Sequence, residues 1–213
     1  MTETRGERKE RTRRAILDAV LELCEDEPLA ALSLRQVAKQ VGIVPTAFYR
    51  HFDSIEELGL DLVDESFTAL RALLKAARTF ETPPASDRAL FLAVADNSVD
   101  ALVAHVPRAE RHFRFLARER LAGPQAVREA VRHQLELIER ELATDIARVP
   151  GAGRWSGDDL LILANLLVNA MLSHAEELAL ASGRPDVVRR VERTARRQLR
   201  MALIGALAWD SSR

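Results

Sequence analysis

The chain has 213 residues, 47% of them hydrophobic, and its 31 Lys and Arg against 32 Asp and Glu give a formal net charge of -1 at pH 7. Abundant Ala, Leu, Arg and Glu with few Gly and Pro favour helices throughout, and the absence of strand-like alternation argues against a β-rich fold. The length fits one small and one larger domain. A lone cysteine, Cys24, excludes a disulfide within the chain and is expected to be a small core residue.

The chain shows no pattern typical of a secretion signal or a membrane span. No apolar stretch follows the basic amino terminus, and the longest apolar run, Leu160 to Leu172, is short and contains Asn165. We therefore expect a cytoplasmic protein with no membrane partner.

The first predicted helix follows a basic segment. Residues 1 to 14 carry six basic and three acidic side chains, and an apolar face then recurs at Ile16, Ala19, Val20 and Leu23. A basic arm is therefore expected to lead into an amphipathic helix.

Ser33 begins the second predicted helix, because its hydroxyl can cap the helix while Gln36 reaches back to close a capping box. Leu34, Val37 and Val41 recur at the spacing of one buried helical face. Gly42 supplies the left-handed backbone that ends this helix.

A third short helix follows the turn, since Pro45 suits a first helical position. Phe48 and Phe52 fall one turn apart and are expected to pack inward. The residues left facing outward are Thr46, Ala47, Tyr49, Arg50 and His51. No Asp or Glu occurs from Pro28 to Phe52, so nothing in this segment would repel phosphate. The pattern predicts a DNA-binding helix-turn-helix, although a plain helical hairpin with a solvated polar face also fits it.

The order of a basic arm, the helix around AILDAVLEL, then LSLRQVAKQVGI and PTAFYRHFDSIEEL closely resembles the amino-terminal domain of the TetR family of transcriptional repressors. The resemblance implies an all-α homodimer, with residues 1–53 as DNA-binding domain and residues 54–213 as ligand-binding and dimerisation domain. It also implies binding to a palindromic double-stranded DNA operator. The residues expected to contact DNA are Arg8, Arg11, Ser33, Arg35, Val44, Pro45, Thr46, Ala47, Tyr49, Arg50 and His51.

Two positions depart from the common pattern of this family. Ile55 stands where many members have a lysine, and Val44 stands where a polar residue is common. The run GIVPTAFYRHF, followed by EELGLDLVDES, resembles the branch that includes FabR and DesT, repressors of unsaturated fatty-acid synthesis that respond to long-chain acyl thioesters. That branch implies acyl-CoA as the effector. The alternative is another hydrophobic small molecule, sensed by a repressor of an efflux or catabolic gene.

Proline, glycine and capping residues divide the rest of the chain into six further helices, which makes nine in all. Ser54 and Glu57 form a second capping box at the start of the first of them. The expected helices run from Ser54 to about Phe80, from Asp87 to His105, from Arg108 to Leu121, from Gly123 and Pro124 to near Pro150, from Ser156 to about Ser182, and from Pro185 to near Trp209.

The last two helices are expected to form the dimer contact, because their apolar residues would be poorly hidden if exposed. A two-fold dimer would place two recognition helices roughly 34 Å apart. A monomer that buries both helices in its own core is the alternative. The expected interface residues are Leu163, Leu167, Met171, Val188, Val191, Ala195, Leu199, Ala202 and Ala206.

Apolar side chains of the middle helices are candidates for an effector cavity between helices, although ordinary core packing explains them too. They are Phe67, Leu70, Leu74, Phe91, Val94, Phe113, Leu116, Leu135, Ile138 and Leu142. Asn165 and Asn169 share one helical face with Ser173 and would bond either a ligand's polar end or the partner subunit. Four arginines between residues 111 and 120 would meet the phosphates of coenzyme A or form a solvated face paired with Glu110 and Glu119. They are Arg111, Arg114, Arg118 and Arg120.

The sequence offers little for an enzyme. It contains no GxSxG, HExxH, phosphate-binding glycine loop or paired-cysteine metal site, and its histidines lack mutual ligand spacing. We therefore expect no catalytic residue, no metal and no cofactor. A helical scaffold that binds only protein is a third class of function compatible with the hairpin.

Overall fold

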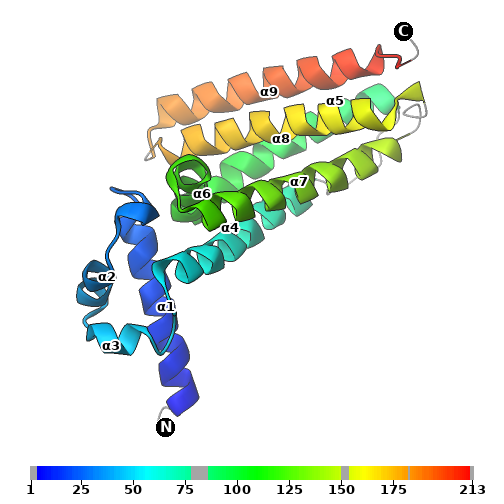
Figure 1. The fold of residues 1–213 in the computed structure, drawn as a ribbon. Helices are drawn as coiled ribbons and strands as arrows, with labels where there is room; N and C mark the ends of the chain where they lie inside the picture. The colour runs from blue at the N-terminus through cyan, green and yellow to red at the C-terminus, as the bar shows by residue number, and fades with distance from the viewer. Residues whose placement is uncertain (1–3, 78–85, 150–153, 182, 212–213) are drawn as a thin grey trace. The chain divides into compact units, whose positions relative to one another are not determined.

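The structure is a computed structural model that describes residues 4–77, 86–149, 154–181 and 183–211. Within these ranges it contains helices and no β-strand, so the predicted all-α class is confirmed. The helices, labelled in Figure 1, are α1 (Arg5–Leu23), α2 (Leu34–Val41), α3 (Pro45–Phe48), α4 (Ile55–Ala77), α5 (Asp87–His105), α6 (Glu110–Ala122), α7 (Gln125–Ala147), α8 (Gly157–Ala179) and α9 (Pro185–Leu207), with two 3-10 helices, η1 (Leu29–Ala31) and η2 (Val106–Ala109).

The chain forms two compact units. Unit 1 comprises Met1–Phe67 and Arg111–Arg132, and unit 2 comprises Thr68–Glu110 and His133–Arg213. Unit 1 therefore extends beyond the DNA-binding segment 1–53 expected from the sequence, because it also includes most of α6 and the start of α7. Both α4 and α7 contribute residues to each unit.

The basic residues expected as an arm lie inside α1 instead. This helix begins at Arg5 because Thr4 and Glu7 form a capping box, in which the Glu7 amide donates to Thr4 Oγ1 at 3.2 Å and the Thr4 amide donates to Glu7 Oε2 at 2.7 Å. The sequence carried this signal, a threonine followed three residues later by a glutamate. The expected arm is thus the first turns of a helix.

The second helix begins and ends where the sequence predicts. The Gln36 amide donates to Ser33 Oγ at 3.2 Å, and the Ser33 amide donates to Gln36 Oε1 at 2.8 Å. Gly42 ends the helix in left-handed backbone, with φ of 74°. Val37 and Ala38 are buried, as one inward face requires.

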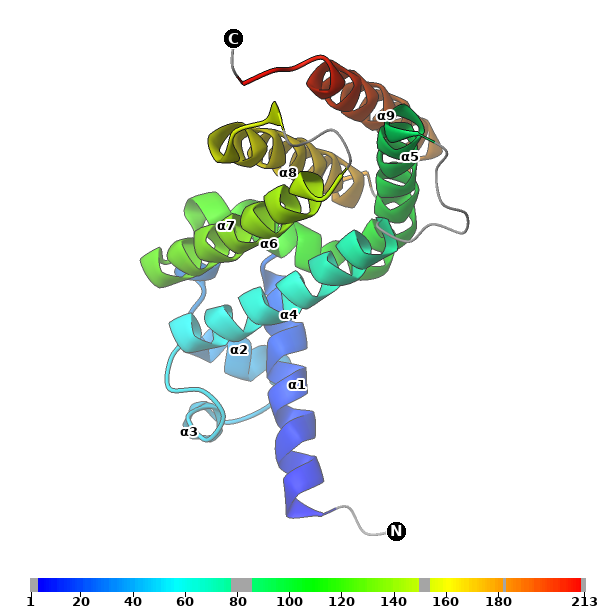
Figure 2. The ribbon, with the colours of Figure 1, turned by 90° about the vertical axis from the view of Figure 1, so that its right-hand side faces the viewer.

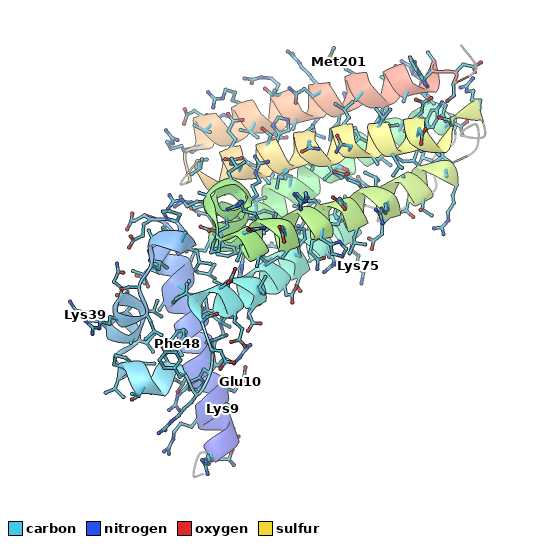
Figure 3. All side chains as sticks on the ribbon, viewed as in Figure 1. Lys9, Glu10, Lys39, Phe48, Lys75 and Met201 are labelled. Atoms are coloured by element: carbon cyan, nitrogen blue, oxygen red, sulfur yellow. The ribbon has the colours of Figure 1, made fainter. Side chains whose placement is uncertain are left out.

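The recognition helix α3 is shorter than the expected span to Phe52. After Phe48 the backbone tightens, since the His51 amide donates to the Phe48 carbonyl at 2.8 Å, a three-residue hydrogen bond. The Phe52 amide still reaches the Phe48 carbonyl at 3.1 Å, so both rings face inward as predicted, with centroids 5.8 Å apart. In Figure 3 the Phe48 side chain points toward α1.

The remaining helix bounds differ from those expected mainly at their ends. At the start of α4 the Glu57 amide donates to Ser54 Oγ at 3.0 Å, but the Glu57 carboxylate accepts from the Asp53 amide instead of closing a box on Ser54. The expected extension of α4 to Phe80 lies outside the described residues. A 3-10 turn, η2, precedes α6, because Pro107 cannot supply the amide that a continuous helix needs.

In unit 2, α9 packs against both α5 and α8, and the three run side by side in Figures 1 and 2. Their shared core contains Phe91, Ala95, Val99, Ala195, Leu199 and Leu203. Ion pairs join the edges of α5 and α9, with Arg196 to Asp96 at 3.1 Å and Arg200 to Asp96 at 2.7 Å.

One stretch, Asp87–Ala122, is long and apolar enough to cross a membrane by length and composition alone. Phe91, Val99 and Leu102 from this stretch are buried inside the protein, and η2 interrupts it. The buried share of its apolar window is 33%, and a single stretch of this length and composition is weak evidence for a membrane span.

Candidate DNA-binding face and effector cavity

The candidate DNA-binding face comprises the start of α3 and the turn after it. Its predicted side chains are exposed, except that Ala47 and His51 are half-buried. Val44 is 64% exposed and Tyr49 is 59% exposed. The other predicted DNA contacts are exposed too, namely Arg8, Arg11, Ser33, Arg35, Pro45, Thr46 and Arg50. Lys39, on α2, also projects outward (Figure 3).

Two further arginines of α1 hold this helix against α4. The Arg13 guanidinium pairs with Asp61 and lies 4.8 Å from the centroid of the Phe52 ring. Arg14 pairs with Glu65 at 2.7 Å. Two of the six basic residues before residue 15 are therefore paired with acidic residues that follow the helix-turn-helix. Fewer basic side chains of residues 1 to 14 are left to bind phosphate than the composition suggests.

His51 lies at the edge of the face in an unusual environment. Its Nδ1 is buried and has no hydrogen-bond partner among the described residues. The pKa of His51 lies below its ordinary value, because burial disfavours the charged ring and Lys9, Arg13 and Arg50 add positive charge nearby. Both effects favour the neutral form of the ring over the charged one.

Three of the four α6 arginines contact Glu25, a partner that the sequence analysis did not expect. Arg111 Nε lies 2.8 Å and Arg114 Nη1 3.4 Å from the carboxylate of Glu25, at the end of α1. Arg118 Nη2 donates to the Glu25 carbonyl at 3.0 Å. These arginines thus tie α6 to the connection between α1 and α2, within unit 1.

Glu119, expected on a solvated face, is fully buried beside that connection. Its Oε1 accepts from the Leu29 amide at 3.0 Å, while Oε2 has no partner among the described residues. Burial raises the pKa of Glu119 above its ordinary value. Cys24 is buried nearby, as predicted, and burial with the adjacent Glu119 raises the pKa of its thiol to about 12, which leaves it unreactive.

Unit 2 contains an apolar cavity of about 100 Å³ between five helices. Six of the predicted effector contacts line it, namely Leu70, Leu74, Val94, Leu135, Ile138 and Leu142. Its remaining lining residues are Leu73, Ala77, Ser98, Leu102, Leu167, Val168, Met171, Leu172, Ala175, Leu199 and Leu203. No charged side chain is among the described residues of this lining. Ser98 is polar, and the sequence analysis did not identify it.

Four predicted effector contacts lie elsewhere. Phe67, Phe113 and Leu116 are buried in unit 1, where α6 packs, so they are not part of this cavity. Phe91 belongs to the unit 2 core, with its ring centroid 6.3 Å from that of Trp155. All four are apolar residues at helical spacing, for which composition alone cannot separate core from cavity.

Asn165 and Asn169 do not line the cavity either. Both are exposed on the outer face of α8. Asn165 Nδ2 donates to Glu139 Oε1 at 2.9 Å, and Asn169 Nδ2 donates to the Asn165 carbonyl at 2.9 Å. Their placement is incompatible with a role at the polar end of a ligand in this cavity.

The predicted dimer residues divide into two groups. Leu167, Met171 and Leu199 line the cavity, and Val191 and Ala195 are fully buried in the core of unit 2, so among these five only Met171 is partly exposed. Leu163, Val188, Ala202 and Ala206 are half-buried.

Leu163, Ala202 and Ala206 line a second groove of about 390 Å³, which also includes Trp155, Asp159, Ile162, Leu166, Gly205 and Trp209. Beside it, Met201 is 75% exposed and projects outward (Figure 3). Ile162, Leu166 and Met201, which the sequence analysis did not name as interface residues, are exposed on the same two helices.

A capped helix, a glycine turn and a second short helix with an outward-facing Tyr-Arg pair define a helix-turn-helix protein of the DNA-binding class. Residues 16–62 match the family described as bacterial regulatory proteins, tetR family. An uncharacterized HTH-type transcriptional regulator of Haemophilus influenzae is 38% identical over 148 residues, which is 69% of each chain. The chain belongs to the tetR family. It is accordingly a transcriptional regulator that binds DNA and not an enzyme.

Solved structures share its fold. The fatty acid degradation regulator FadR from Bacillus halodurans superposes with a TM-score of 0.66 at 10% identity, covering 94% of this chain and 97% of that one. A TetR-like transcriptional regulator from Rhodococcus sp. RHA1 gives a TM-score of 0.59 at 18% identity, covering 92% and 96%. At these identities the likeness is one of fold.

Proposed function

We propose that this regulator is a dimeric repressor whose affinity for a palindromic operator is set by a long-chain acyl thioester, such as acyl-CoA, bound in the unit 2 cavity. The observation that carries the proposal is the lining of that cavity. Leu, Ile, Val, Ala and Met side chains make up the lining, apart from Ser98. Such a surface suits a hydrocarbon chain.

The chemistry of the lining also narrows the class of effector. A cationic compound would need a carboxylate or an aromatic face to replace its water, and neither is among the described lining residues. The alternative proposal, an uncharged hydrophobic molecule handled by an efflux or catabolic system, satisfies the same lining. Fold similarity to a fatty acid degradation regulator and the sequence resemblance to the FabR and DesT branch favour the acyl chain.

The size of the cavity supplies a mechanism. About 100 Å³ is well below the roughly 300–1,000 Å³ of typical small-molecule sites, so a long acyl chain can enter only if the surrounding helices move apart. Four residues of α4 line the cavity, namely Leu70, Leu73, Leu74 and Ala77, and the same helix begins directly after the recognition segment. A ligand that favours the expanded arrangement therefore shifts the population of α4 positions and, through them, operator affinity.

A second copy of the chain is the proposed protein partner. The groove formed by Ile162, Leu166 and Trp209, with Met201 beside it, exposes apolar side chains that water solvates poorly. A two-fold contact through this surface of α8 and α9 places the same patch of each subunit against the other. Because its target is chromosomal DNA, we propose that the protein acts in the cytoplasm.

The test is a fluorescence anisotropy titration of a labelled duplex from the DNA upstream of the gene, at fixed salt. Added saturated acyl-CoA should weaken binding by roughly 5- to 150-fold, the usual range of allosteric coupling. Unsaturated acyl-CoA should weaken it less or strengthen it, because a cis double bond bends the chain. Free coenzyme A is the control for the polar headgroup.

Leu135→Trp should abolish the response by filling the cavity, whereas Leu121→Trp, at a position 73% exposed in unit 1, should leave it intact. If neither acyl-CoA changes operator affinity in the wild type, the acyl-sensor proposal is wrong, and the DNA-binding assignment is untouched.

A further inference from the structure

Val44 occupies the N-cap position of α3, directly before Pro45. An N-cap side chain normally supplies an oxygen to the free amides of the first turn, which is why Ser, Thr, Asp and Asn are preferred there. Val44 makes no such hydrogen bond, and its side chain is 64% exposed. Valine at this position thus forms no capping hydrogen bond, and its two methyl groups are exposed to water. The little burial of the side chain does not compensate for these two losses in stability.

The residues around Val44 show which part of the DNA-binding face it belongs to. The candidate DNA-binding face carries its polar groups at Thr46, Tyr49 and Arg50, and its start is apolar at Val44 and Pro45. Residues at the N-terminal end of a recognition helix are those that reach base edges in the major groove. An apolar surface there requires an apolar complement on the DNA.

The major groove offers one apolar group, the C5-methyl of thymine. We propose that Val44 reads a thymine methyl in each half-site, so the operator carries an A·T pair where α3 begins. This inference rests on the DNA-binding function and adds a base preference to it. Tyr49 and Arg50 then form hydrogen bonds with other base pairs or with phosphate, while the methyl contact of Val44 selects the A·T pair at this position.

A double-mutant cycle between protein and DNA tests the inference. A high-affinity duplex is first selected from a random pool with the wild-type protein, and each thymine is then replaced singly with deoxyuridine, which removes only the methyl group. At one position per half-site the wild type should bind roughly three- to five-fold more weakly, the loss expected for one buried methyl-sized group. Val44→Ala should bind the two duplexes equally at that position.

Val44→Ser is the second variant, because it supplies a capping oxygen while removing both methyls. Its thermal stability should equal or exceed that of the wild type, and its sensitivity to deoxyuridine should be lost. If every deoxyuridine substitution affects the wild type and both variants alike, Val44 does not read a methyl and the inference is wrong. If the pool yields no preferred duplex at all, the DNA-binding assignment itself fails, which is a separate result.

Discussion

Arg50 and Tyr49 are the single residues on which DNA binding should depend most. Arg50 is exposed, and the Tyr49 ring packs edge-on against the buried Phe48 ring at 6.1 Å, which fixes its direction. Arg50→Ala should weaken operator binding about ten- to a hundred-fold, and Tyr49→Phe by a smaller factor, in an anisotropy titration. Arg189→Ala, an exposed arginine of α9, is the matched control. Unchanged affinity in both variants with intact helical circular dichroism would contradict the assigned face.

Gly123 lies where there is no room for a side chain. A Cβ at this position would lie 2.6 Å from the Glu119 carbonyl oxygen and 2.7 Å from its Oε2. Gly123→Ala should therefore destabilise the fold by about 1–3 kcal/mol, measured by urea unfolding. Gly157→Ala, where a Cβ would meet nothing within 4 Å, should leave stability unchanged or slightly raised. Equal stability of the two variants would show that Glu119 is not confined as described.

At the scale of elements, the sequence predicted the parts that depend on local rules. The Ser33 cap, the Gly42 turn and the inward Phe48 and Phe52 follow from neighbouring residues, and all four are found in the structure. The arginines of α6 could not be placed in this way, because their partner Glu25 lies about 90 residues away in sequence. Cavity-lining residues could not be distinguished from core residues in the sequence, since both are apolar residues at helical spacing.

The contact between α6 and α4 should make stability depend on pH. His112 on α6 shares a hydrogen bond with Ser66 Oγ of α4 at 3.0 Å, and burial lowers its pKa below the ordinary value of 6.5. A lowered pKa means that the unfolded chain binds the proton first, so stability is fully present above pH 6.5 and is lost as the pH falls below it. The Tm of the wild type should fall more between pH 7 and pH 5 than that of His112→Gln, measured by circular dichroism. Parallel curves for the two proteins would contradict the role of His112.

At the scale of the whole molecule, the exposed apolar surface of α8 and α9 should set the oligomeric state. Ile162 is 66% exposed and Leu166 is 53% exposed in a single chain. The double variant Ile162→Glu and Leu166→Glu should run as a monomer in size-exclusion chromatography with light scattering, since two pairs of carboxylates would meet across a two-fold axis. Leu121→Glu, on an exposed residue of unit 1, should remain a dimer. If the wild type, the double variant and Leu121→Glu were all dimers, the dimer interface would have to lie on another surface.

The function of this regulator depends most on sequence-specific binding of double-stranded DNA by the helix-turn-helix. The most direct measurement is an anisotropy titration of the full-length protein, at 150 mM salt, against the duplex from its own upstream region and a scrambled duplex of equal length. We predict that the upstream duplex binds at least about a thousand-fold more tightly, with two chains per duplex. Equal affinity for the two duplexes would contradict the account.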